Sequence, residues 1–249
     1  MMNFCRRVVN DVVERQKASG RYLMKERVEW RVRMLETANH MRDEEKAMLS
    51  GVILAGGSNR RMGGFHKALL PFQNEKLIQR QIRRMKQLCT EMILVTNEPG
   101  VFLPLVRNDV RIITDYYTGK GPLGGMHAAF SLSQYADIWL VGCDMPFISP
   151  QAAKLMLDKK RKMNCDAVIP CVDGRLQPLH GIFDKRCAKT IPEMLNKGMH
   201  KVGSFLDLIT VERVPESTFR NSGIDTRFVL NVNTPEDYER ALRMDYTSS

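Results

Sequence analysis

The residues best suited to chemistry lie between positions 51 and 72, in the segment GVILAGGSNRRMGGFHKALLPF. Its apolar run from Val52 to Leu54 predicts a strand buried on both faces of a parallel sheet. The strand leads into glycines that let a ligand approach the backbone, followed by positive charges on Arg60, Arg61 and Lys67. This order predicts a loop that holds a polyphosphate, and the alternative is a glycine-rich surface turn with solvated arginines.

Two aspartates follow other apolar segments. Asp144 ends the run IWLVGC, where a carboxylate costs stability unless it is partnered or solvated, and a divalent cation is an apt partner. We therefore expect a divalent cation at Asp144, with capping of the next helix as the alternative. Asp115 precedes a glycine-rich stretch and a helix whose first N–H groups suit an anion. It is either a ligand contact or a turn-forming aspartate.

The segment NVNTPEDYERAL, residues 231–242, combines a helix start with two amides. Thr234 is a natural N-cap, with Pro235 at the first helical position. Asn231 and Asn233 are not explained by helix initiation. On alternate residues of a strand end they face opposite sides, so one of them can point into a cleft. A functional role and structural capping both remain open for the two asparagines.

The run L-A-G-G-x-x-x-R-M-G-x-x-x-K, from Leu54 to Lys67, resembles the nucleotide-binding signature of the molybdenum cofactor guanylyltransferases. That family belongs to the nucleotidyltransferases with a Rossmann-like fold. The Cys-Asp-x-Pro motif at 143–146 is also similar, as is Asp115 followed by Gly-Pro-Leu-x-Gly. The resemblance covers about residues 50–244. One departure is His66, since many relatives have aspartate before the lysine.

The resemblance implies a role for each matching residue. The backbone of the first loop would hold the nucleotide, Lys67 and the loop arginines would contact phosphates, and Asp144 would bind the metal. Asn97 lies one residue past the position where some relatives place an asparagine against the base. The predicted nucleotide-binding residues are Leu54, Ala55, Gly56, Gly57, Lys67, Asn97, Asp115 and Asp144. The predicted catalytic residues are Lys67, Asp144 and Arg61, and the predicted metal ligands are Asp144 and Asn233.

From residue 51 onward strands and helices alternate, which predicts a parallel sheet with right-handed crossovers. With the resemblance, this indicates an α/β three-layer sandwich around a mostly parallel, twisted, Rossmann-like sheet of the nucleotide-diphospho-sugar transferase type. We expect strands at 51–55, 92–96, 110–114, 138–141, 166–169, 179–183 and 210–214. We expect helices at 75–89, 125–134, 150–162, 185–197 and 235–244. Ligands of such sheets bind beyond the carboxyl ends of the strands.

The chain divides near residue 49. Residues 1–48 have no proline and many charges, which favours a helical N-terminal extension of unknown role. The extension is expected to pack on the catalytic domain or on a dimer mate, with a partly disordered arm or a nucleic-acid-binding or regulatory arm as alternatives. Residues 49–249 form the predicted nucleotidyltransferase domain.

Composition is consistent with an enzyme of one main domain. The 249 residues are 43% hydrophobic, enough for one substantial core. The net charge of +10 suits anionic ligands and would suit nucleic acid equally well. Six cysteines without a C-x-x-C pair are expected to be reduced structural thiols, and His180 is expected to be a core histidine. No segment is apolar for long enough to span a membrane and no secretory signal is evident, so a cytoplasmic location is expected.

The resemblance implies transfer of GMP from GTP to the phosphate of molybdopterin, with Mg²⁺ as cofactor and release of pyrophosphate. Other molybdenum cofactor biosynthesis proteins and acceptor molybdoenzymes are possible partners, and neither a membrane nor a nucleic acid is expected. A related enzyme that uses CTP or another phosphate acceptor is one alternative. A non-catalytic protein that binds GTP or nucleic acid is the other.

Overall fold

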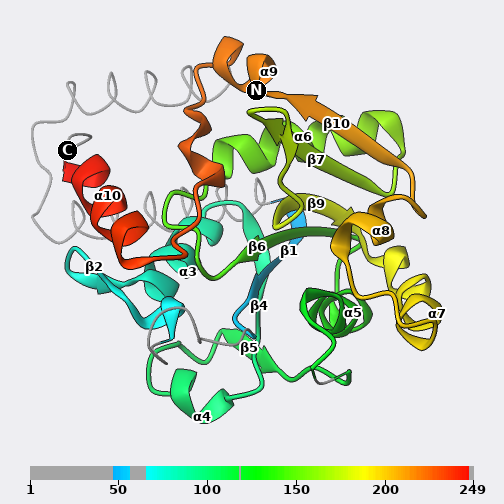
Figure 1. Cartoon of the computed structure of the whole chain (residues 1–249), viewed down its shortest axis with the longest axis horizontal. Coiled ribbons are helices and arrows are strands. Elements are labelled where there is room, and N and C mark those ends of the chain that lie inside the picture. The colour runs from blue at the N-terminus through cyan, green and yellow to red at the C-terminus, as the bar shows by residue number, and fades with distance from the viewer. Residues whose placement is uncertain (1–46, 57–65, 118, 247–249) are drawn as a thin grey trace, which may run out of the picture. The chain divides into compact units, whose positions relative to one another are not determined.

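The computed structural model describes residues 47–56, 66–117 and 119–246. Residues 1–46 of the predicted extension at 1–48 and the loop at 57–65 lie outside these ranges, whereas Ala47 and Met48 begin a strand. The division of the chain near residue 49 stays a prediction. The described chain forms one mixed sheet of eight strands with helices on both faces (Figure 1). No helix within it combines the length and the apolar character that crossing a membrane requires.

The main sheet has the strand order β10-β7-β9-β6-β1-β4-β5, and β8 pairs with β7. The strands are β1 (Ala47–Leu54), β4 (Cys89–Val95), β5 (Val110–Ile113), β6 (Asp137–Gly142), β7 (Ala167–Val172), β8 (Arg175–Leu176), β9 (His180–Asp184) and β10 (Val211–Pro215). β1 lies between β4 and β6 and is parallel to both. β5 is parallel to β4 and β10 is parallel to β7, whereas β9 is antiparallel to β6 and β7. The sheet is therefore mixed but mostly parallel, as predicted.

Alternate residues of β1 point to two separate cores. Leu49 and Ile53 pack with one set of helices, whereas Val52 and Leu54 pack with the other. The first core takes apolar residues from α3 (Leu77–Met85), α4 (Pro99–Phe102), α6 (Pro150–Met163) and α9 (Glu216–Asn221). The second takes them from α5 (Pro122–Leu132), α7 (Ile191–Asn196) and α8 (Val202–Leu206). The predicted three-layer sandwich is therefore confirmed.

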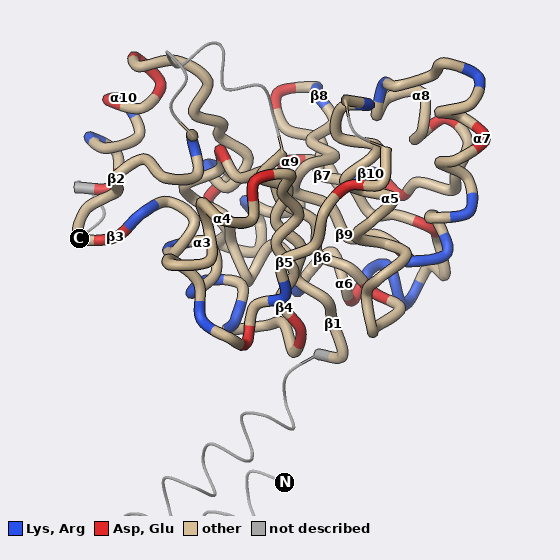
Figure 2. Tube along the Cα trace, turned by 90° about the horizontal axis from the view of Figure 1, so that it is seen from below, with Lys and Arg blue, Asp and Glu red and all other residues tan. Residues whose placement is uncertain are grey.

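A small third core joins the hairpin of β2 (Pro71–Phe72) and β3 (Glu75–Lys76) to the C-terminal helix α10 (Pro235–Tyr246). Phe72 and Val232 are buried in it, and the Tyr238 hydroxyl donates to the carbonyl of Pro71. This contact brings the segment before α10 next to the segment that follows the glycine-rich loop. Basic and acidic residues are interspersed around the outside of the described chain (Figure 2).

The structure differs from the predicted elements at a few ends. The helix predicted at 75–89 is shorter, because Glu75 and Lys76 pair with the hairpin and Cys89 begins β4. A left-handed residue, Gln73 with φ 56°, makes the hairpin turn. The strand end expected at Asn231 and Asn233 does not form, since residues 226–229 are a 3-10 helix and residues 231–233 belong to neither a helix nor a strand. The short elements α4, α8, α9 and β8 were not predicted.

His180 is a fully buried histidine between the rings of Trp139 and Phe228. Its Nε2 accepts the N–H of Ser149 at 3.4 Å, which suits a neutral ring. Burial lowers the pKa of His180 to about 3 from an ordinary value of 6.5. The expectation of a core histidine is confirmed.

We predict that His180 makes the fold sensitive to acid. Between pH 6.5 and 3 the unfolded chain binds one more proton at this residue than the folded chain, so stability falls as pH falls. From pH 7 to pH 5 the loss is about 2 kcal/mol. His180→Phe keeps an aromatic ring but cannot titrate, so urea unfolding should show a smaller drop over this interval than in the wild type. An identical drop in both proteins would contradict this account.

Candidate active site

Three backbone hydrogen bonds tie together the carboxyl ends of the central strands. The N–H of Cys143 donates to Leu54 at 3.1 Å, that of Ala55 to Val95 at 2.8 Å, and that of Thr96 to Ile113 at 3.0 Å. The strand order reverses at β1, with β4 on one side and β6 on the other. The segments that follow these strands therefore border one crevice, which is where α/β sheets bind ligands.

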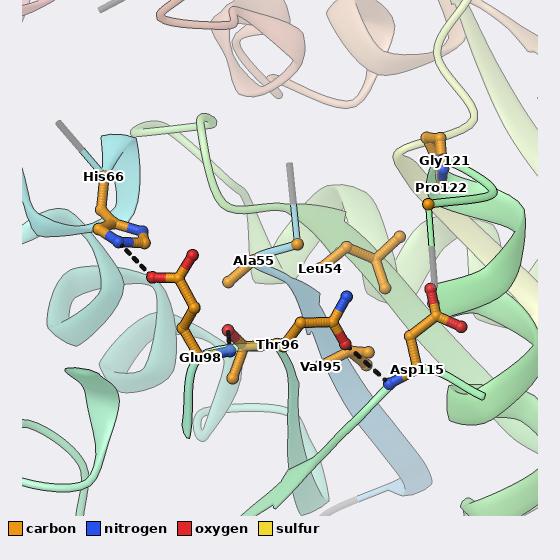
Figure 3. Close-up of a pocket in the computed structure, with 13 residues that line it drawn as sticks. Leu54, Ala55, His66, Val95, Thr96, Glu98, Asp115, Gly121 and Pro122 are labelled. Carbon is orange, nitrogen blue, oxygen red and sulfur yellow. Dashed lines mark hydrogen bonds and ion pairs between the residues drawn. The ribbon is translucent and has the colours of Figure 1, made fainter. Parts of the chain in front are cut away.

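Two adjoining pockets open in this crevice. The larger, of about 330 Å³, is lined by Leu54, Ala55, Gly56, His66, Val95, Thr96, Asn97, Glu98, Asp115, Gly119, Gly121, Pro122 and Gly125. The smaller, of about 150 Å³, shares five of these residues and adds Lys67, Ala68, Gly142, Cys143, Asp144 and Leu179. In the larger pocket His66 and Glu98 lie on one side and Asp115 and Pro122 on the other (Figure 3). Its size and shape suit a nucleoside, with the charged groups of the smaller pocket beside it.

Lys67, Asp144 and Asn233 come together in and beside the smaller pocket. The Nζ of Lys67 donates to Asn233 Oδ1 at 2.7 Å and lies 3.5 Å from Asp144 Oδ2. The N–H of Val232 donates to the carbonyl of Asp144 at 2.8 Å, which brings Asn233 to the site. Three segments far apart in the sequence thus supply one cation, one carboxylate and one amide. Asn231, by contrast, is exposed.

Asp144 is held close to the backbone of its own loop. A Cβ added to Gly142 would lie 2.8 Å from Asp144 Oδ1, so a larger residue there would displace the carboxylate from this position. Burial raises the pKa of the Asp144 carboxyl, and the nearby Lys67 ammonium opposes the shift. The negative charge of Asp144 is therefore only partly compensated by the protein. Its carboxylate oxygens line the smaller pocket, and such oxygens are the ligands that hard cations prefer. These features fit a divalent cation.

Gln81 of α3 fixes the loop that contains Asp144 by hydrogen bonds to its backbone. The side chain is fully buried in α3, and its Nε2 donates to the carbonyls of Gly142 at 2.7 Å and Met145 at 2.9 Å. These carbonyls flank Asp144 in the chain. Two arginines of α3 continue the pattern, since Arg80 donates to Pro146 and Arg84 donates to Ile148. Helix α3 thus fixes the loop that carries Asp144.

Asp115 and Asn97 border the opposite side of the larger pocket. Asp115 Oδ1 accepts the N–H of Tyr117 at 2.6 Å, so the residue forms the turn that was its alternative interpretation. A Cβ on Gly124 would lie 2.4 Å from Asp115 Oδ2, which places the carboxylate against the start of α5. The Oδ1 of Asn97 accepts the N–H of Asp115 at 3.2 Å, which leaves its amide nitrogen as a donor.

The other residues singled out in the sequence have different positions. Leu54, Ala55 and Gly56 line both pockets, although the Ala55 amide is engaged by Val95. Gly57 and Arg61 lie outside the described residues. Thr234 accepts the N–H of Asp237 at the start of α10, as expected of an N-cap. Cys143 lines the smaller pocket as a neutral thiol, because burial raises its pKa to about 12.

Sequence reasoning did not select Glu98 or Gln81. His66 was noted only as a departure, and the structure pairs its Nε2 with Glu98 Oε2 at 2.8 Å. Glu98 lies three residues after the end of β4, so its position after a strand was an available signal. Gln81 had none, because a glutamine within a charged helix resembles a surface residue.

The fold and the site together identify the class of enzyme to which the protein belongs. A nucleoside-sized pocket at the reversal point of a mixed α/β sheet, beside a lysine and a partly uncompensated carboxylate, is the arrangement of a nucleotidyltransferase. The model of the family described as MobA-like NTP transferase domain matches residues 51–212. The chain belongs to this family.

Named relatives agree with this assignment. The chain is 38% identical over 193 residues to a probable molybdenum cofactor guanylyltransferase from Pelotomaculum thermopropionicum, covering 77% of this chain and 91% of the relative. A protein of the same description from Natranaerobius thermophilus is 30% identical over 195 residues, covering 78% and 94%. The crystal structure of molybdopterin-guanine dinucleotide biosynthesis protein A from Archaeoglobus fulgidus has a TM-score of 0.68 and 25% identity, covering 80% of this chain and 99% of that one.

We predict that Gln81→Met destabilises the protein. The variant keeps the volume but removes both donors, leaving the carbonyls of Gly142 and Met145 without them. At about 1–3 kcal/mol for each of the two unsatisfied groups, the free energy of unfolding should fall by roughly 2–6 kcal/mol. Gln87→Met, at an exposed position just after α3, is the matched control and should change little. Denaturant unfolding that shows equal stability for the two variants would refute the support role.

Proposed function

We propose that this protein transfers GMP from GTP to the phosphate of molybdopterin and releases pyrophosphate. The observation that carries the proposal is the cluster of Lys67, Asp144 and Asn233 beside the larger pocket. The names of the relatives supply the substrates: two are probable molybdenum cofactor guanylyltransferases, and one is a molybdopterin-guanine dinucleotide biosynthesis protein. The product is the guanine dinucleotide form of the cofactor.

Each pocket of the crevice is proposed to bind a different part of the nucleotide. The larger pocket takes the guanosine, and the smaller pocket takes the phosphates. Lys67 places its ammonium against the triphosphate, and Arg61 of the preceding loop is proposed to assist it. A phosphate oxygen of molybdopterin attacks the α-phosphorus, the bond from the α-phosphorus to its bridging oxygen breaks, and pyrophosphate leaves. The attacking oxygen is already ionised, so no general base is needed.

Asp144 is the proposed ligand of a divalent cation, Mg²⁺ in our proposal. The described residues contain no cluster of three or more His, Cys, Asp or Glu side chains, so most other ligands would be phosphate oxygens and waters, as Mg²⁺ prefers. Asn233 Oδ1 is a second candidate ligand, although it accepts from Lys67 here. When bound, the ion neutralises charge on the reacting phosphates. Asp144 would hold the ion, and Lys67, whose Nζ lies 3.5 Å from Asp144 Oδ2, would contact the phosphates beside it.

The wider setting is part of the proposal. We infer that the enzyme works in the cytoplasm with other molybdenum cofactor biosynthesis proteins and acceptor molybdoenzymes. The part of the predicted extension that precedes β1 (Ala47–Leu54), residues 1–46, is proposed to be helical.

The test is pyrophosphate release from each of the four NTPs with Mg²⁺ and molybdopterin supplied. We predict turnover with GTP that depends on both molybdopterin and Mg²⁺, with CTP at least about tenfold poorer in kcat/KM, since a site built to hydrogen-bond guanine rejects a base that leaves its polar groups unpaired. Asp158→Asn, on the exposed face of α6, should behave as the wild type. Comparable kcat/KM for CTP and GTP would instead assign a cytidylyltransferase, and absence of turnover with every NTP would leave a binding protein.

A further inference from the structure

The small third core contacts all three chain segments that supply Lys67, Asp144 and Asn233. Lys67 and Asn233 lie outside the main sheet, so strand pairing alone does not bring them to Asp144. Each of the three segments instead contributes an apolar side chain to the third core. The buried members are Phe72 of the hairpin, Phe147 of the loop after Asp144, Val232 beside Asn233, and Ala241 of α10. The geometry of the cluster therefore depends on how these segments meet.

Arg80 of α3 reaches the same three segments with one buried guanidinium. Its Nη2 donates to Asp245 Oδ1 of α10 at 2.6 Å, and its Nε donates to the carbonyl of Pro146 at 3.2 Å. Its Cζ lies 4.8 Å from the centre of the Phe72 ring in the hairpin, a cation–π contact, and its Nη1 lies 3.9 Å from Glu75. Helix α3, the hairpin and α10 lie together at one side of the sheet (Figure 1). One side chain thus links the hairpin, the loop after Asp144 and α10.

The chemistry of Arg80 suits a role in geometry better than a role in stability. A buried ion pair that is replaced by apolar residues of similar volume often leaves stability unchanged, so such a pair is weak evidence for a stabilising role. The planar guanidinium instead fixes the direction of each of its hydrogen bonds, which apolar packing does not do. We infer that Arg80 is a positioning residue, which holds the segments of Lys67, Asp144 and Asn233 at the mutual distances that nucleotidyl transfer requires.

This role separates the reaction from the binding of the nucleotide. None of the described residues that line the larger pocket belongs to the third core, since most of them lie at the ends of β1, β4 and β5 or at the start of α5. Displacement of the three segments should therefore slow the reaction more than it weakens binding of the nucleoside. A misplacement of about 1 Å can lower a rate by roughly a hundredfold. The inference rests on the proposed function for the reaction that Arg80 supports.

The first test compares the kinetics of Arg80→Lys and wild type with GTP, Mg²⁺ and molybdopterin. Lysine keeps a cation for Asp245, so the variant should fold, but its single ammonium cannot also reproduce the Nε bond to Pro146. We expect kcat to fall by roughly 10- to 100-fold while KM for GTP changes less than about threefold. Arg83→Lys is the matched control, because Arg83 contacts Glu75 from the exposed side of the same helix. A kcat within about twofold of wild type in folded Arg80→Lys, or a rise in KM as large as the fall in kcat, would overturn the inference.

Hydrogen exchange without ligands gives a second readout, which does not depend on turnover. The amide of Val232 donates to the carbonyl of Asp144 and the amide of Leu77 donates to that of Leu70, so the two amides report on the α10 segment and on the hairpin. If one side chain holds both segments, the two amides of the unaltered protein should open together, with protection factors within about threefold. In Arg80→Lys both should exchange at least about tenfold faster, while the amides of β1 stay protected.

The exchange measurement also separates the inference from the proposed function. Independent opening of the two amides in the unaltered protein would overturn the inference even if the variant did not fold. An equal loss of protection in β1 would make Arg80 a residue of general stability and would overturn it as well. If the exchange results are as expected but wild type turns over no NTP, the proposed function fails, while Arg80 still holds the three segments together.

Discussion

The structure depends on the position of β1 between two parallel partners. Because β4 and β6 run in the same direction on either side of it, the segments after all three strands must leave the sheet at one edge. The apolar residues of β1 alternate between two buried cores, which fixes its register and therefore the place where Leu54 ends. The crevice and its two pockets are a consequence of this arrangement.

The site requires that the Asp144 carboxylate be buried away from water, which is unfavourable for a charged group. Burial raises the pKa of Asp144, and one lysine at 3.5 Å opposes this only in part. The fold fixes the loop around the carboxylate: Gly142 leaves room for it, and Gln81 donates to the carbonyls of Gly142 and Met145. A buried carboxylate whose charge is only partly compensated is suited to a divalent cation.

Much of this was predictable from sequence, for physical reasons. Lys67 and Asp144 could be selected because each follows a buried strand, and chain order alone brings such residues to one edge of a parallel sheet. The reversed direction of β9, the support given by Gln81 and the pairing of His66 with Glu98 arise from contacts between distant segments. Patterns among residues that are close in the sequence do not show such contacts. The hairpin of β2 and β3 was not predicted, because its strands are only two residues long.

The central claim is that Lys67 and Asp144 act on the same triphosphate as one unit. The most direct measurement is a double-mutant cycle on kcat/KM for GTP, with Lys67→Ala, Asp144→Asn and the double variant, each checked for folding by circular dichroism. If the two residues act together, each single variant should lose at least about a hundredfold, and the double variant should lose little more than the worse single one. Losses that multiply in the double variant would show independent roles and contradict the account.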